Sequence, residues 1–521
     1  MTTTVASPPR AWWEGRPYAL LLIALSVVPL LWPPIPPLTD LLGHMGRYRV
    51  QLDIDSSPYL AQYFGFKWAI LANLGVDLLV QALAPLIGLE PAVKLVVLAI
   101  PPITVAGLIG IVRETHGRVP ATAAFALPLA WGYPYQFGFV NFALSMGLAM
   151  CAFALWLRLG RLGWRRLRMG LFVPIGIAIW FAHVFGWGVL GLLVFSAELV
   201  AYRRSGDGLI IAAIRAGLAC WPLWPPILLM VAWRGQAAGT TGDWFYWRVK
   251  LGYLLSVLRE RWRDWDIVGA LLLHVLFVVA VVERRFRVDP VLALAAAVMA
   301  ITFAVLPRIL LGSAYADMRL APTVVMCAVL AFNPSGFSHR GQAAWAIGAT
   351  LFFLARVGTS TAALALYSAG WQAQEPALDH IARGSRVLAL ASMPCSREWH
   401  TARTEHLSSL ATVRRDAFVN DQWVMPGAQL LTVHYDKGGR YTRDPSQIVR
   451  PTRRCRSRAE SLLEPAVQSF PRDAFDYVWL IDVAPAKRPV DYPELIPLWF
   501  GERSGALYRV DHSVSGTPRS D

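Results

Sequence analysis

Charged residues are scarce in this chain, making up 16% of its 521 residues, whereas ordinary globular domains contain about 25%. Hydrophobic residues make up 55%, and apolar runs recur from Tyr18 to Leu366. A helix needs about 20 mostly apolar residues to cross a bilayer, and lipid cannot satisfy an unpaired backbone group, so such runs must be helical. The composition excludes a soluble globular protein and predicts a polytopic membrane protein.

Cysteine is also rare. Cys151, Cys220 and Cys327 lie inside apolar runs and are expected to be inert packing residues. Cys395 and Cys455 follow the last apolar run, where a disulfide between them requires an oxidising compartment. No CxxC or Cys/His spacing indicates a metal. No small-residue cleavage site follows the first apolar run, so we expect a retained first helix.

The arginines underlie a net charge of +15, but they cluster in short loops between apolar runs, which indicates membrane topology rather than nucleic-acid binding. One apolar run, 69–89, is unusual because Asn73, Asp77 and Gln81 share one helical face, and we expect it to lie in the interface. The eleven remaining runs are expected to be spans: 17–35, 92–112, 119–133, 139–157, 170–184, 187–202, 209–232, 267–282, 290–306, 320–333 and 343–366. This count places the N-terminus and the basic loops in the cytoplasm: 113–118, 158–169, 203–208, 283–289 and 333–342.

The expected fold class is an α-helical polytopic membrane protein, with about eleven spans, carrying a C-terminal α/β soluble domain. Strand-like and helix-like segments alternate after the last apolar run, with strands expected at 386–392, 428–434, 477–483 and 506–510 and helices at 405–418 and 495–502. This tail has no glycine-rich phosphate loop, no nucleophile elbow and no other catalytic signal. The expected division is a cytoplasmic N-terminus 1–16, a membrane domain 17–369 with an external first loop 36–91, a linker 370–379, and a periplasmic domain 380–521.

The first external loop holds the clearest group of chemically active residues. Asp40, His44 and Arg47 share one face if this stretch is helical. A carboxylate there can act as a general base on a hydroxyl, and an arginine can pair with a phosphate. Asp53 and Asp55 follow in an Asp-x-Asp pattern that could bind a divalent cation. An amphipathic surface helix with solvated loop acids remains the alternative.

Polar residues near the external ends of later spans are further candidates for substrate binding. His183 is expected close in depth to the first loop, although a packing histidine is the alternative. Arg308, Asp317 and Arg319 lie in the expected external loop 307–319, and two external arginines, against the usual inside bias, suggest an anionic ligand. Alternatively, Asp317 and Arg319 pair with each other or with lipid head groups.

The layout resembles the GT-C superfamily of polyprenyl-phosphate-sugar-dependent glycosyltransferases. The stretch NLGVDLLVQALAPLIGLEPAVKLVVLAIPPITVAGLIGIVRETHGRVPATAAFALPLAW is similar to that superfamily's juxtamembrane helix, second span, basic turn and third span. The resemblance implies that Asp40, just after the first span, is the catalytic carboxylate. It also implies a lipid-phosphate sugar donor and an inverting transfer. The sequence departs from the superfamily in lacking an acidic pair there, since the companion of Asp40 is His44.

These patterns favour a glycosyltransferase of the bacterial inner membrane. It would transfer a sugar from a polyprenyl-phosphate donor to a periplasmic lipid, glycan or protein, with membrane lipid as a partner and no nucleic acid. Asp40 and His44 would be catalytic, no metal ligand is assigned, and a divalent cation remains open. Two alternatives are a transporter of a lipid-linked substrate, disfavoured by the absence of an internal repeat, and a non-catalytic assembly protein whose tail binds a partner.

Overall fold

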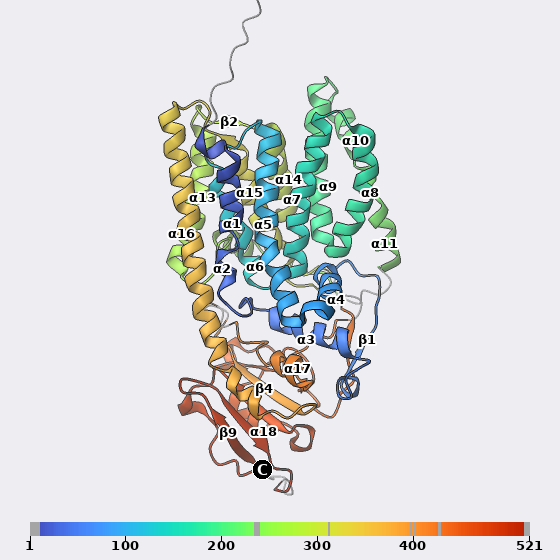
Figure 1. Cartoon of the computed structure of the whole chain (residues 1–521), viewed down its shortest axis with the longest axis vertical. Helices are drawn as coiled ribbons and strands as arrows, with labels where there is room; N and C mark the ends of the chain where they lie inside the picture. The colour runs from blue at the N-terminus through green and yellow to red at the C-terminus, as the bar shows by residue number, and fades with distance from the viewer. Residues whose placement is uncertain are drawn as a thin grey trace, which may run out of the picture.

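A computed structural model describes residues 11–233, 240–310, 313–395, 399–400, 403–425 and 429–514. A bundle of helices carries a smaller, sheet-containing domain at one end (Figure 1). Five helices in the described residues are long and apolar enough to cross a membrane, and a pair bent by 45° (Leu209–Ala219 and Trp221–Val231) adds a sixth if it forms one span. The predicted class, a helical membrane protein with a C-terminal α/β domain, is confirmed.

Most of the expected apolar runs form one or two helices. The five long ones are α5 (Leu89–His116), α7 (Val140–Arg161), α9 (Val184–Arg204), α13 (Arg263–Val282) and α16 (His339–Gln372). The shorter ones are α1 (Arg16–Leu25), α2 (Val28–Leu31), α8 (Arg165–Ala182), α10 (Leu209–Ala219), α11 (Pro225–Trp233), α14 (Pro290–Val305) and α15 (Ala316–Leu330).

The run 119–133 is not an α-helix, which corrects the expectation of a helical span there. It forms two short 3-10 helices, Ala123–Phe125 and Leu127–Trp131, because Pro120 and Pro128 interrupt helical hydrogen bonding. The run is almost entirely buried. Non-helical backbone is tolerated at membrane depth when protein surrounds it.

The basic loops gather at one end of the bundle, and the C-terminal domain lies at the other (Figure 1). Two ion pairs join these loops to each other and to the N-terminal segment, Arg161–Glu114 at 2.7 Å and Arg118–Glu14 at 3.3 Å. At the same end, β2 (Arg287–Val288) pairs antiparallel with β3 (Phe332–Asn333). This relative arrangement agrees with the sorting of loops by charge.

The run 69–89 contains α4 (Gly75–Ile87) and ends where α5 begins, at Leu89. The 13 residues of α4 extend about 20 Å, less than the roughly 30 Å hydrocarbon core. Leu78 and Leu86 on its apolar face are exposed. Its polar face packs on α3 (Leu41–Asp53), where Gln51 Nε2 donates to Gln81 Oε1 at 2.9 Å. The polar face therefore meets protein, while the apolar face remains exposed, which is compatible with the expected interfacial position.

The C-terminal domain is built on one mixed sheet. The strands β5 (Phe418–Val419), β4 (Arg386–Ser392), β8 (Tyr477–Ile481), β10 (Ala506–Val510) and β9 (Leu495–Phe500) lie in that order, and β7 (Ile448–Val449) also pairs with β4. The strands β5, β7 and β8 are parallel to β4, whereas β10 is antiparallel to β8 and β9 is antiparallel to β10. The short helices α17 (Ser409–Arg415) and α18 (Leu463–Ser469) complete the domain.

Two expectations for the tail are wrong. Residues 495–502 were expected to form a helix, but 495–500 form β9 because they pair with β10. The expected linker 370–379 is largely helical, since α16 continues to Gln372 and a 3-10 helix follows at Glu375–His380. The strand expected at 428–434 is β6 (Leu431–Val433), and its first residue, Ala428, lies outside the described residues.

The first external loop forms part of the C-terminal domain. The strand β1 (Phe64–Phe66) pairs antiparallel with β6, and Val50, Leu60 and Phe64 are buried in the same hydrophobic cluster as Leu388 of β4. The disulfide considered from the sequence is present between Cys395 and Cys455. The tail therefore shares its core with a segment that precedes it by more than 300 residues.

Candidate functional site

Asp40 lies where the first loop meets the bundle, immediately before α3. Its backbone N–H donates to Phe137 O at 3.0 Å, so the loop is fixed on the segment after the short helix α6 (Tyr133–Gln136). Gly138 makes this contact possible because it has a φ of +95°, and a Cβ there would lie 2.6 Å from Asp40 N. Only glycine fits such a position without strain.

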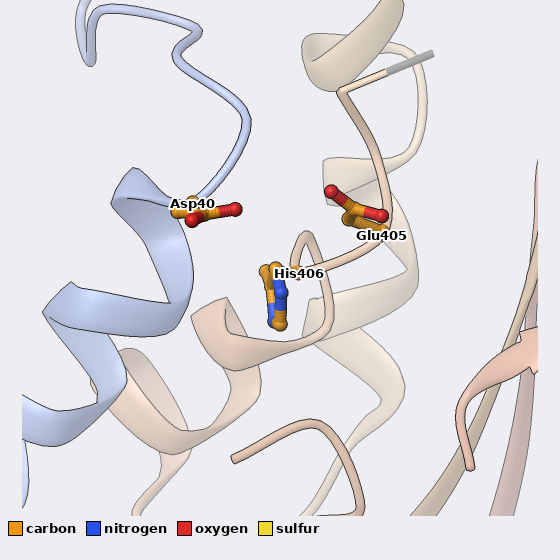
Figure 2. Close-up of side chains that lie close together, drawn as sticks. All are labelled: Asp40, Glu405 and His406. Atoms are coloured by element: carbon orange, nitrogen blue, oxygen red, sulfur yellow. The ribbon is translucent and has the colours of Figure 1, made fainter. Parts of the chain in front are cut away.

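Glu405 and His406 reach the same place from the C-terminal domain, in the segment before α17. This segment is held by Arg403, whose Nη1 donates to Pro37 O at 2.8 Å and whose guanidinium stacks 4.0 Å from the centre of the Tyr367 ring. Figure 2 shows the carboxyl groups of Asp40 and Glu405 turned toward each other, with the His406 ring nearby. One ligand atom of each residue lies within 4.8 Å of the others.

The two carboxyl groups differ from other acids inside the protein, which pair with a cation or, like Asp421, accept hydrogen bonds from hydroxyl groups. Asp77, Asp266 and Asp317 each meet an arginine or lysine at 2.6–3.1 Å, as buried charges require. Within the described residues, no hydrogen bond or ion pair satisfies the carboxyl group of Asp40 or Glu405. Unpaired acids in an enclosed site are candidates for catalysis or ligand binding.

Burial and mutual repulsion control the protonation of this pair. Burial raises the pKa of Asp40 well above its usual range, and Glu405 and Asp444 raise it further, while Arg319 opposes them. Burial and Asp444 raise the pKa of Glu405 to about 7. Burial also raises the pKa of Asp444 to about 6. Two neighbouring carboxyl groups with raised pKa values share a proton near neutral pH.

His406 is neutral at neutral pH, because burial lowers its pKa to about 3. Its Nδ1 lies 3.1 Å from Asp421 O, and since a carbonyl can only accept, Nδ1 carries the proton. Nε2 therefore keeps a lone pair, an arrangement common in metal-binding histidines. Together with Asp40 and Glu405, it forms a ligand set suited to a divalent cation that accepts both oxygen and nitrogen.

The three residues expected to share one face of the first helix follow one another along α3 but have different side-chain partners. Asp40 is the N-cap of α3, and its O accepts from His44 N at 3.1 Å. The His44 ring packs on the Trp423 ring with the ring centres 5.1 Å apart, and its Nδ1 lies 3.5 Å from Arg47 Nη2. Arg47 forms a fully buried ion pair with Asp77 of α4 at 2.6 Å, and Asn141 also binds Asp77. Arg47 therefore joins α3 to α4, and its charge is already neutralised by an acid.

Asp53 and Asp55 lie at the far end of α3, about 20 Å from Asp40 for a helix of this length. Asp53 accepts from Arg49 Nη1 at 2.7 Å, and Asp55 is exposed. In the described part of the chain, the single group with metal-ligand geometry is Asp40, Glu405 and His406. Asp53 and Asp55 are outside that group.

Arg319 acts electrostatically on Asp40 from α15. Its guanidinium lies 4.2 Å from the centre of the Phe139 ring, and its Nε has no hydrogen-bond partner. It lines a cavity of about 40 Å³ whose other walls are mainly apolar, including Tyr135, Phe142 and Met146. His183 packs against Phe142, with its Nδ1 accepting from Phe185 N, so it lies near Arg319.

Arg308 and Asp317 are bound to other residues. Arg308 lies 3.6 Å from Asp243 and near the Tyr315 ring. Asp317 pairs at 3.1 Å with Lys250 of α12 (Trp247–Leu255), rather than with Arg319 as one alternative had it. Of the arginines expected to bind substrate, Arg319 is the one whose charge acts on the Asp40 carboxyl group.

Glu405, His406 and Lys250 were not identified from the sequence. The adjacent Glu405-His406 pair before a short helix was the available signal, but a two-residue motif is common. Its significance arises only when the fold brings it to Asp40, 365 positions earlier (405 minus 40).

No protein-family model matches the chain, and no curated protein matches it. Among solved structures, the chain is similar to that of ArnT from Cupriavidus metallidurans bound to undecaprenyl phosphate. The two chains share 13% sequence identity, the match covers 96% of this chain and 98% of that one, and the TM-score is 0.45.

Proposed function

We propose that the chain is a membrane glycosyltransferase of the GT-C type, which transfers a sugar from a polyprenyl-phosphate donor to an acceptor at the outer face of the membrane. The observation that carries this proposal is the meeting of two unpaired carboxyl groups, Asp40 and Glu405, with Arg319 close by beside an apolar cavity. These groups provide a base, a proton partner and a cation for a phosphate.

The chemistry assigns a role to each group. One carboxylate of the Asp40–Glu405 pair takes the proton of an acceptor hydroxyl as that oxygen attacks the anomeric carbon of the sugar. The bond from this carbon to the phosphate oxygen breaks, and polyprenyl phosphate leaves with the bonding electrons. Arg319 stabilises the charge that accumulates on the phosphate. Attack opposite the leaving group inverts the anomeric centre.

The surroundings of Arg319 are compatible with a lipid-linked donor. Its small cavity is lined mostly by apolar side chains of α6, α7, α15 and the 3-10 helix Leu127–Trp131. The site lies at the end of the bundle opposite the arginine-rich loops (Figure 1). Because such loops face the cytoplasm in bacterial membranes, the site would open to the periplasm.

A divalent cation is compatible with this site. Asp40, Glu405 and His406 would hold the cation, which when bound would offset the negative charge of the donor phosphate. The roles of Asp40 as proton acceptor and of Arg319 as phosphate partner follow from the chain's own residues.

The test measures transfer from a polyprenyl-phosphate-linked sugar by the purified protein in detergent. We expect Asp40→Asn to lower the transfer rate by about 10²–10⁴, the usual contribution of acid–base catalysis, while donor binding persists. We expect Arg319→Ala to weaken donor binding instead, because a phosphate contact is lost.

Asp55→Asn is the matched control, since it removes an exposed acid from the same loop. Its activity should equal that of the unmodified protein. Near-normal turnover by folded Asp40→Asn would remove the assignment of the catalytic residue. Normal turnover and donor binding in both variants would refute the proposed site.

A further inference from the structure

The C-terminal domain has a second cavity, separate from the Asp40 site. It measures about 460 Å³, within the ~300–1,000 Å³ typical of ligand sites. It opens where the parallel strands β4, β7 and β8 end, and its lining includes Ser392 and Arg450 directly at these ends. In open α/β sheets, the carboxyl ends of the strands are the usual place for a binding site.

The lining of this cavity is largely aliphatic. Val449, Leu463, Val467, Val483 and Val490 contribute to it, and the Val490 side chain is 74% exposed. Glu464 contributes the acidic group on the lining. Such a surface suits one or two aliphatic side chains of a partner.

A segment rich in arginine borders the cavity. Arg453, Arg454, Arg456 and Arg458 are all exposed, and none has an ion pair or hydrogen bond from its side chain within the described residues. The segment leaves the cavity wall at Arg450 and Pro451 and returns to it at Leu462. We call these four residues the arginine rim.

The segment that carries the arginine rim is fixed to the rest of the domain by a disulfide and by hydrogen bonds. The disulfide Cys395–Cys455 joins it to the chain just after β4. Arg450 anchors its beginning by donating to Glu460 Oε1 at 2.6 Å, and Ser457 N donates to Glu460 Oε2 at 2.7 Å. A constrained group of cations loses less conformational entropy when it binds an anion.

Two more cationic residues, Lys487 and Arg488, line the cavity itself and add to the positive charge of the rim. Lys487 is exposed, and Arg488 Nη2 donates to Gly501 O while its Nε has no hydrogen-bond partner. In Figure 1, α18, which lines the cavity, lies on the side of β4 away from the bundle. This position disfavours membrane lipid as the source of the matching negative charge.

We propose that this surface binds an acidic peptide segment of another protein, with an aliphatic side chain of that segment inserted into the cavity. Opposite charges around a central apolar anchor are the usual arrangement of a specific interface. Nucleic acid fits less well because single strands are held by stacking on several aromatic rings, and the lining has one aromatic residue, Tyr492. The inference is independent of the glycosyltransferase proposal.

The experiment uses the full-length protein in detergent and a short fluorescent peptide with a Leu-Leu pair flanked by Asp and Glu, observed by fluorescence anisotropy. We expect R453A/R454A/R456A to weaken binding by about tenfold, since each exposed charge pair contributes a small amount. V490D should also weaken it, because a charge would face the aliphatic pocket. The control K437A/R503A/R509A removes the same number of exposed cations elsewhere in the domain and should bind normally.

Two further probes distinguish the chemistry of the partner. A peptide with Ser-Ser in place of Leu-Leu should bind more weakly than the first, and a carboxylated polysaccharide should not compete at equal charge concentration. Equal binding of the first peptide by the rim variant and the unmodified protein would overturn the proposal. Equal binding of the two peptides, or competition by the polysaccharide, would also overturn it, because charge alone would then be recognised.

Discussion

At the scale of single residues, the carboxyl groups of Asp40 and Glu405 lie together with no cation bonded to either of them in the described residues. The carboxyl group of Glu405 is therefore more easily protonated than that of an ordinary glutamate, so the stability of the fold depends on pH. Glu405 has a folded-state pKa of about 7 against an ordinary value of 4.5. A raised folded pKa means that the protonated form stabilises the fold, and that this contribution is lost as the pH rises through about 7.

Glu405→Gln should remove this pH dependence. The variant keeps a neutral side chain, so its free energy of unfolding should exceed that of the unmodified protein by roughly 1–3 kcal/mol at pH 8 and by little near pH 4.5. Thermal unfolding in detergent at both pH values measures the difference. The exposed acid Asp55 is the control, since Asp55→Asn should leave both curves unchanged. An equal effect of Glu405→Gln at the two pH values would contradict the assigned pKa.

At the scale of elements, the entry to α3 depends on its contact with the turn after α6. Gly138→Ala should destabilise the fold by about 1–3 kcal/mol, the usual strain of a disfavoured backbone conformation, because its Cβ would also collide with Asp40 N. It should lower transfer activity as well by displacing Asp40. Gly188→Ala in α9 is the matched control, since a Cβ there meets nothing within 4 Å. Equal unfolding temperatures for the two variants would show that the contact is unimportant.

Local periodicity predicted the elements better than it predicted the site. The helix after Asp40 and the polar face of α4 follow from residue spacing, and both are present. The expected grouping of Asp40 with His44 stays a prediction, since Asp40 is the N-cap of the helix and His44 N donates to Asp40 O at 3.1 Å, as in a helical turn. Glu405 and His406 could not be found in this way, since their approach to Asp40 depends on how the whole chain folds.

At the scale of the whole molecule, the orientation in the membrane can be tested with the tail cysteines. We expect Cys395 and Cys455, after mild reduction, to react with a membrane-impermeant maleimide in intact cells, because their domain lies opposite the basic loops. A cysteine introduced at exposed Arg340, at the other end, should react only after the cells are permeabilised. The reverse pattern would invert the topology and place the Asp40 site in the cytoplasm.

The pairing of β1 with β6 also concerns biosynthesis. Phe66 and Leu431 are adjacent in the sheet but separated by 365 residues of chain (431 minus 66). At the usual rate of translation, the ribosome needs roughly 20–70 s to make that stretch. During this interval the first loop has already emerged, while the strand and core that cover Val50, Leu60 and Phe64 do not yet exist. The strand edge of the nascent loop therefore stays unpaired, and open to aggregation and proteolysis, until the last quarter of the chain has been synthesised.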